Sequence, residues 1–118
     1  IAAETVDISL KRLLEAVEKS GGTAFITADH GNLDEMFEID PKSGSFQKDG
    51  KTGKYKNKTS HTLNPVPAII YDPLFNGEYE LNRTVRDPGR GSVAATLLNL
   101  LGYDAPADYL PSLINLKR

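Results

Sequence analysis

Two short apolar runs, each next to one of the two histidines of the chain, most constrain its fold. Residues 23–28 and 66–71 are rich in β-branched and aromatic side chains and are bounded by glycine or proline, which is the pattern of short buried strands. An amphipathic helix is predicted over residues 3–19, and Gly21 and Gly22 end it. This order of helix and strand predicts an α/β fold with a doubly wound layer.

The remaining segments predict smaller elements. We expect one or two helical turns over residues 33–39, an edge strand over 78–81, and a helix over 93–101 with Ser92 as its N-cap. Residues 105–114 are expected to pack over the sheet, and we find no internal repeat and no second domain. Each helix should bury its apolar stripe, which consists of Val6, Leu10, Leu13, Leu14 and Val17 in the first helix and Val93, Leu97, Leu98, Leu100 and Leu101 in the second.

Residues 40–58 differ in composition from the rest of the chain. The segment contains three glycines, and Asp49-Gly50 is typical of a tight turn. We predict a flexible, lysine-rich insertion. It is either a basic flap that attracts an acidic, phosphorylated substrate or a solvated loop, and a solvated loop is the commoner case. The six lysines are Lys42, Lys48, Lys51, Lys54, Lys56 and Lys58.

The two histidine motifs contain the candidate metal ligands. Asp29 and His30 directly follow the first predicted strand, and His61 precedes the second. At one edge of one sheet, these side chains would form a carboxylate and imidazole set that suits manganese or zinc, although three ligands make only one incomplete site. The alternative is that Asp29 caps a turn and His30 is an ordinary, partly buried histidine. Asp34 and Glu35 either hold the histidines in place or are exposed acids, which is the commoner case.

Composition excludes several classes of function. A net charge of −2 gives no general attraction to nucleic acid or anionic lipid, and the arginines between residues 83 and 90 are interpreted as surface charge. The sequence has no cysteine, which excludes disulfides and thiolate metal sites. No apolar run approaches the ~20 residues that a membrane-spanning helix needs. The first residues are unlike a signal sequence, and a chain that begins with Ile1 inside a helical pattern is expected to be a fragment.

Residues 27–36, Thr-Ala-Asp-His-Gly-Asn-Leu-Asp-Glu-Met, and residues 60–67, Ser-His-Thr-Leu-Asn-Pro-Val-Pro, resemble a known family. They are similar to the cofactor-independent phosphoglycerate mutases of the alkaline phosphatase superfamily, which do not require 2,3-bisphosphoglycerate. The resemblance covers nearly the whole chain, but those mutases are several times longer. It implies that residues 1–118 are the C-terminal part of the phosphatase-like domain, and hence part of an alkaline-phosphatase-like three-layer α/β/α domain.

The resemblance also implies a reaction. The family interconverts 3-phosphoglycerate and 2-phosphoglycerate in glycolysis and gluconeogenesis, through a phosphoserine and two divalent metal ions. Manganese is the expected ion, with magnesium, zinc and cobalt as alternatives. By resemblance, Asp29 and His30 bind the metal next to the nucleophilic serine, and His61 binds the second metal. The serine belongs upstream, so this chain contains no catalytic nucleophile and is expected to be inactive alone.

The expected partners are phosphoglycerate and the rest of the same polypeptide, and the expected compartment is the cytoplasm. One departure from the family is that His61 follows His30 by 31 residues (61 − 30), a longer separation than in many of these mutases. Another enzyme of the superfamily, such as a phosphopentomutase or a phosphodiesterase, is an alternative against which residues 64–67, Asn-Pro-Val-Pro, argue. A third alternative is a non-catalytic module that binds partners through the lysine-rich segment.

Overall fold

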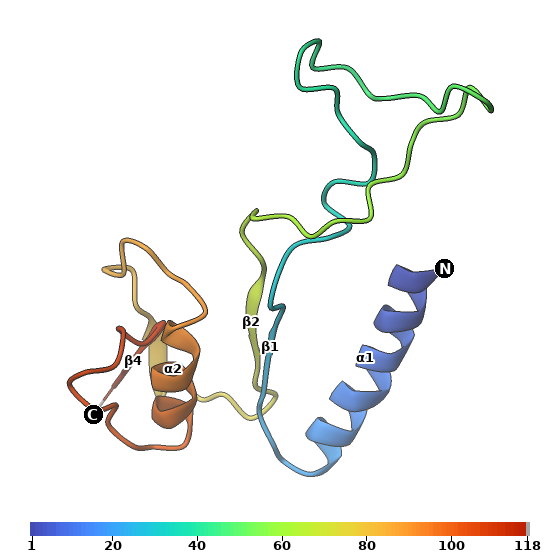
Figure 1. Cartoon of the computed structure of the whole chain (residues 1–118). Coiled ribbons are helices and arrows are strands. Elements are labelled where there is room, and N and C mark those ends of the chain that lie inside the picture. The colour runs from blue at the N-terminus through green and yellow to red at the C-terminus, as the bar shows by residue number, and fades with distance from the viewer. Residues whose placement is uncertain (118) are drawn as a thin grey trace. The chain divides into compact units, whose positions relative to one another are not determined.

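The fold combines short helices and strands, as Figure 1 shows, in a computed structural model that describes residues 1–117. The strands form two two-stranded sheets, in which β1 pairs with β2 and β3 pairs with β4. This mixture confirms the expected α/β class. In chain order the elements are α1 (Ala2–Lys19), β1 (Ala24–Thr27), β2 (Ala68–Tyr71), β3 (Tyr79–Leu81), α2 (Ser92–Leu100) and β4 (Ile114–Leu116).

The described residues form two compact units. Unit 1 consists of residues 1–26 and the described residues from 69 onward, and unit 2 consists of residues 27–68. Unit 1 contains both helices and most of the strand residues. Unit 2 contains both histidine motifs and the lysine-rich segment, so the candidate metal ligands all lie within one unit. A single partial domain with a flexible insertion at 40–58 stays a prediction.

The first predicted helix is confirmed as α1. Gly21 adopts a φ of 66°, and the N–H of Gly22 donates to the carbonyl of Val17 at 2.9 Å, which closes the end of the helix. The predicted burial of its apolar stripe is wrong, because none of the described residues of α1 is buried, and Val6 and Leu13 are 67% and 64% exposed. A two-stranded sheet is too narrow to cover such a helix. No helix in residues 1–117 is both long and apolar enough to cross a membrane.

Both predicted strands next to the histidine motifs are confirmed. β1 occupies four of the six residues predicted as the first strand, and β2 occupies the last four of residues 66–71. The second strand starts late because Pro67 has no N–H to donate to a neighbouring strand. Along the chain, each histidine motif therefore lies only a few residues from a strand of the β1–β2 sheet.

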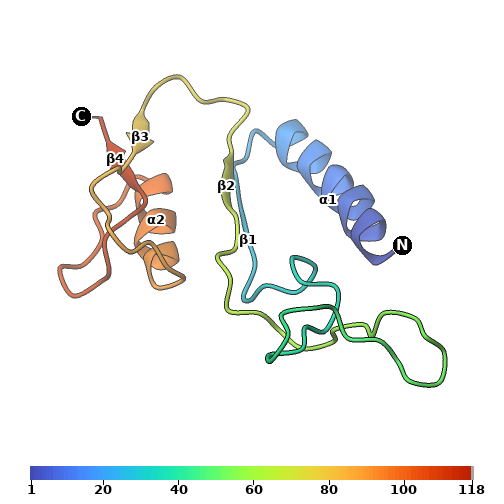
Figure 2. The same ribbon diagram turned by 90° about the horizontal axis from the view of Figure 1, so that it is seen from above.

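The C-terminal part of unit 1 packs α2 against β4, which pairs antiparallel with β3 (Figure 2). The predicted edge strand is confirmed as β3, where Leu81 lies opposite Ile114. The expectation for residues 105–114 is wrong at its end, because Ile114 begins a strand instead of lying over a sheet. The partner strand satisfies backbone groups that an unpaired edge would expose. Ala95 and Ile114, 0% and 2% exposed, are the buried apolar side chains among residues 1–117.

Small polar side chains, rather than leucines, form the buried face of α2. Gly91, and not Ser92, is the N-cap, and Ser92 and Thr96 are buried together with Ala95. The hydroxyl of Thr96 donates to the carbonyl of Ser92 at 2.7 Å and accepts the N–H of Leu113 at 2.9 Å. Small residues thus allow the chain that enters β4 to approach the helix closely. The predicted burial is wrong for two leucines that are exposed, Leu97 and Leu101.

Residues 33–39 in unit 2 are not helical, so the predicted helical turns are wrong. Phe37 forms an antiparallel bridge with Asn57, and Ile39 forms one with Phe46. The N–H of Glu38 donates to the carbonyl of Lys56 at 2.9 Å. This long-range pairing holds the backbone extended and overrides the local helical pattern.

The lysine-rich segment contains two copies of one turn, nine residues apart, so the expectation of no internal repeat is wrong at this scale. Asp40 and Asp49 begin the turns. Gly44 and Gly53 each adopt a φ of 67° and donate their N–H to the carbonyl of the aspartate at 2.8 Å. Each aspartate carboxylate also accepts two backbone N–H groups, those of Lys42 and Ser43 in the first turn and of Lys51 and Thr52 in the second.

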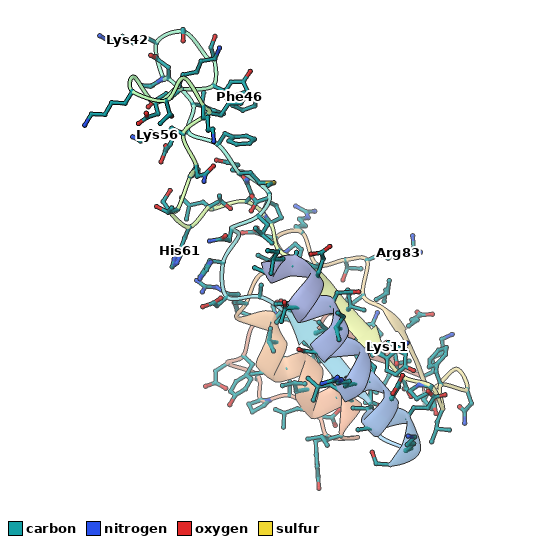
Figure 3. The ribbon with its side chains drawn as sticks, turned by 90° about the vertical axis from the view of Figure 1, so that its right-hand side faces the viewer. Lys11, Lys42, Phe46, Lys56, His61 and Arg83 are labelled. Atoms are coloured by element: carbon teal, nitrogen blue, oxygen red, sulfur yellow. The ribbon has the colours of Figure 1, made fainter. Side chains whose placement is uncertain are left out.

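Three aromatic rings follow the same nine-residue spacing. Phe37, Phe46 and Tyr55 pack against one another with ring centroids 5.5–5.7 Å apart. The ammonium of Lys48 lies 5.6 Å from the centre of the Tyr55 ring, at the outer limit of a cation–π contact. Figure 3 shows Lys42, Phe46 and Lys56 at the end of unit 2 away from His61. The segment therefore has a defined architecture built from turns and aromatic contacts.

Candidate metal centre

The two histidines lie face to face. The imidazole rings of His30 and His61 stack with their centroids 3.5 Å apart and an angle of 10° between the ring planes. An antiparallel bridge between Gly31 and Thr62 joins the two segments, and the N–H of Thr62 donates to the carbonyl of Gly31 at 2.9 Å. The expectation that the two motifs meet is thus confirmed, whereas their role as ligands stays a prediction.

The missing side chain of Gly31 permits this close approach. A Cβ atom at Gly31 would lie 2.0 Å from Oγ1 of Thr62 and 2.9 Å from Oδ1 of Asp34. The φ of Gly31 is not positive, so the requirement for glycine comes from space and not from backbone conformation. Gly31 and Thr62 are both buried, which leaves little room for adjustment.

A backbone carbonyl orients the imidazole ring of His30. Nδ1 lies 3.1 Å from the carbonyl oxygen of Gly31, and because a carbonyl only accepts, Nδ1 carries the proton of this hydrogen bond. Nε2 is then the ring nitrogen that is left for another partner. Oδ1 of the exposed Asp29 carboxylate lies 3.5 Å from that nitrogen. A carboxylate oxygen and an imidazole nitrogen are therefore placed side by side.

A set of five polar side chains, the polar cluster, connects the segments that carry the histidines. Oδ2 of Asp34 accepts a hydrogen bond from Oγ1 of Thr62 at 2.8 Å and another from the side-chain amide of Asn64. The same amide donates to Oε1 of Glu35 at 2.9 Å, and the ammonium of Lys58 pairs with Oε2 of Glu35. Asp34 and Glu35 thus contact residues on both sides of His61.

The polar cluster favours the charged forms of its ionisable side chains. Hydrogen bonds from Asn64 and then Thr62 lower the pKa of the Asp34 carboxyl. The hydrogen bond from Lys58 is the main cause of the lowered pKa of Glu35, and Glu35 in turn raises the pKa of Lys58. Sequence reasoning left open whether the two acids hold the histidines, and it missed Lys58 and Asn64. The opposite charges of Glu35 and Lys58 make an ion pair possible, but only the fold shows that two residues so far apart in the sequence form one.

The geometry near His30 suits part of a metal site. Two ligands of one tetrahedral ion, each at about 2.1 Å, lie about 3.4 Å apart, and the separation of Asp29 Oδ1 and His30 Nε2 is 3.5 Å. Within residues 1–117, no group of three or more His, Asp or Glu side chains is arranged to hold one ion. Asp29 and His30 therefore fit two positions around one ion, and His61 does not complete that site.

Known proteins are similar to this chain in sequence and in fold. A family model described as the Metalloenzyme superfamily matches residues 1–105. A probable 2,3-bisphosphoglycerate-independent phosphoglycerate mutase of Leptospira interrogans is 46% identical over 113 residues, which cover 96% of this chain and 20% of the relative. The 2,3-bisphosphoglycerate-independent phosphoglycerate mutase 1 of Arabidopsis thaliana is 42% identical over 114 residues, which cover 97% of this chain and 20% of the relative.

A solved structure agrees with these relatives. The chain matches a structure of Leishmania mexicana phosphoglycerate mutase, described as obtained at low cobalt concentration, with a TM-score of 0.85 and 43% identity over 97% of this chain and 20% of that one. The chain spans about a fifth of the length of the curated relatives it matches. The resemblance found in the two histidine motifs is confirmed by these similarities. The chain belongs to the metalloenzyme superfamily.

Proposed function

We propose that the chain is the metal-binding part of a 2,3-bisphosphoglycerate-independent phosphoglycerate mutase, which interconverts 3-phosphoglycerate and 2-phosphoglycerate through a phosphoserine. The observation that carries the proposal is the stacked pair of His30 and His61 with the Asp29 carboxylate beside it. The names of the similar proteins support the choice of reaction. These names favour the mutase over a phosphopentomutase or a phosphodiesterase.

The proposal assigns a ligand role to three side chains. Asp29 and His30 hold one divalent ion through Oδ1 and Nε2, and His61 holds a second. Donation from Nδ1 of His30 to the Gly31 carbonyl fixes the tautomer that leaves Nε2 available for the ion. When bound, two such ions neutralise the charge of a transferring phosphoryl group and lower the pKa of a nucleophilic hydroxyl. We take manganese as the working ion, although oxygen and nitrogen ligands also suit magnesium, zinc and cobalt.

The lysine-rich segment gives unit 2, which contains the proposed ligands, a positive end. Residues 40–58 contain six lysines and two aspartates, a net charge of +4 (6 − 2) in a chain whose net charge is −2. A positive surface raises the local concentration of an acidic phosphate ester. We propose that the segment attracts phosphoglycerate and that the nucleophilic serine lies on a segment outside these residues. By resemblance to the family, we also propose that the enzyme works in the cytoplasm.

The test measures conversion of 3-phosphoglycerate to 2-phosphoglycerate with manganese and without 2,3-bisphosphoglycerate. It compares the product of the complete reading frame, the 118-residue chain, and the His61→Ala variant of the complete product. Asp87→Ala is the matched control, because Asp87 is exposed and belongs to unit 1, whereas the proposed ligands belong to unit 2. Metal content per protein is measured on the same samples.

The expected result is activity in the complete product and in Asp87→Ala, with no activity in the chain alone. His61→Ala is expected to lose both activity and one equivalent of metal. An inactive but folded and metal-loaded complete product would reject the mutase and direct a screen of other phosphate esters. Full activity in His61→Ala would reject the ligand role of His61.

A further inference from the structure

We propose that Asn64 is a positioning residue for the metal ligands, because its single side-chain amide connects the segment of His61 to that of His30. The inference rests on the proposed function, since it assumes that both histidines bind metal. Asn64 lies three residues after His61, and its two acceptors, Asp34 and Glu35, lie four and five residues after His30. One amide thus bridges the two motifs.

A second contact, on the N-terminal side of His61, supports this bridge. Lys58, three residues before His61, pairs with the same Glu35 carboxylate that accepts from Asn64. The segment from Lys58 to Asn64 is therefore attached at both ends to two adjacent acids, with His61 in its middle. Thr62 adds a hydrogen bond to Asp34 at 2.8 Å. These contacts fix the path of the backbone that carries the imidazole.

Fixing that path matters because the two imidazole rings contact each other directly only by stacking. His61 is exposed, and its ring lies parallel to that of His30 at 3.5 Å. Stacking alone allows the rings to slide, whereas ligands of two neighbouring ions must keep their lone pairs in fixed directions. Outer groups that orient metal-ligating histidines typically change metal affinity by about 10–100-fold when they are altered. The amide of Asn64 fits that role, acting through the backbone of its segment.

The decisive variant is Asn64→Asp in the complete protein. It keeps the size of the side chain but places an oxygen against the carboxylates of Asp34 and Glu35, so the bridge is lost. The added negative charge would by itself strengthen the binding of a cation. A weaker affinity therefore cannot be a direct effect of the added charge on the cation, and it points to disturbed positioning. Asn57→Asp is the matched control, since it adds the same charge to unit 2 outside the polar cluster.

The readout is titration with cobalt(II) alone, followed by the visible absorption of the bound ion. We expect Asn64→Asp to bind cobalt about 10–100-fold more weakly than the unaltered protein and to show an altered spectrum. We expect Asn57→Asp to bind at least as tightly as the unaltered protein. At saturating metal, the turnover number of Asn64→Asp should return most of the way to that of the unaltered protein, because the ligands themselves are intact. Asn64→Ala, which removes the donors without adding charge, replaces Asn64→Asp if that variant does not fold.

Two results of the asparagine variants would overturn the inference. One is an unchanged cobalt affinity and spectrum in folded Asn64→Asp or Asn64→Ala. The other is an equal loss in Asn57→Asp, which would make the effect a general one of charge. Failure of the proposed function can be told apart from failure of this inference. If the protein lacks mutase activity but still binds cobalt through His61, the comparison of cobalt affinities still tests the role of Asn64. A cobalt spectrum unaffected by His61→Ala would reject the ligand assignment and this inference with it.

Discussion

Replacing Gly31 with alanine tests the contact that brings the two histidine segments together. The new Cβ would lie 2.0 Å from Oγ1 of Thr62, whereas ordinary contacts begin near 3.4 Å, so the two atoms must separate by about 1.4 Å (3.4 − 2.0). Thr62 is 5% exposed, and its hydroxyl donates to Asp34 at 2.8 Å. The hydroxyl therefore cannot move without losing that hydrogen bond.

The expected cost follows from these two effects. Forcing extra volume into a packed site costs about 1–3 kcal/mol, and loss of the Thr62 hydrogen bond adds about 1 kcal/mol. We therefore expect Gly31→Ala to lower the free energy of local opening by about 2–4 kcal/mol. The N–H of Thr62, which donates to Gly31, is the group that should lose protection.

The assay is hydrogen–deuterium exchange of peptides from residues 27–68 in the complete protein, which reports the free energy of local opening. Gly50→Ala is the matched control, because a Cβ there meets no atom within 4 Å and the φ of Gly50 is not positive. It should be neutral or stabilising by up to about 1 kcal/mol. A similar small effect in Gly31→Ala would refute the steric argument.

The double variant Gly31→Ala/Thr62→Ala identifies the atom responsible. Thr62→Ala removes the hydroxyl that the new Cβ would strike, so the double variant should cost less than the sum of the single variants by about 1–2 kcal/mol. Additivity within about 0.5 kcal/mol would show that the two residues do not interact in this way.

Three further variants test other parts of the chain. Thr96→Val keeps the shape of the side chain but leaves the N–H of Leu113 without its acceptor, so it should destabilise the α2–β4 region by about 1–3 kcal/mol and speed exchange there, whereas Thr96→Ser should retain the bond. Phe46→Ala should remove two aromatic contacts worth about 0.5–1.5 kcal/mol each, with faster exchange confined to residues 37–58. Burial and a hydrogen bond to Asp72 raise the pKa of Tyr79 to about 12, so the stabilisation from its protonated phenol is present below pH 10 and lost between about pH 10 and 12. Ultraviolet titration should show a tyrosine ionisation near pH 12 that disappears in Tyr79→Phe.

Local patterns in the sequence predicted the elements whose stability is local. The apolar periodicity and the paired glycines marked α1 with nearly correct ends, and β-branched runs marked β1 and β2. Burial was not predictable in the same way, because it depends on partners. Leu97 is exposed although it belongs to an apolar stripe, while Thr96 is buried because β4 needs a close approach and an acceptor for its backbone.

Long-range pairing explains what the sequence did not reveal in unit 2. Phe37 carries a helical pattern but bridges to Asn57, 20 residues along the chain (57 − 37), so tertiary hydrogen bonds decide its conformation. The nine-residue repeat is weak in the sequence, because identical residues recur only at the aspartates, the lysines two positions after them and the glycines. The motif around His30 was visible, but Asn64 carries no local signal of its contact with Asp34.

Metal binding should stabilise the two units unequally if the proposed ligands are correct. All three lie in unit 2, whose segments are held together by isolated bridges and the polar cluster, whereas the buried apolar side chains Ala95 and Ile114 lie in unit 1. An ion at 100 times its dissociation constant stabilises the state that binds it by about 2.7 kcal/mol. Removing manganese with a chelator should therefore speed exchange around Gly31 and Thr62 and leave residues 92–100 unchanged. Equal loss of protection in both units would contradict the placement of the metal ligands.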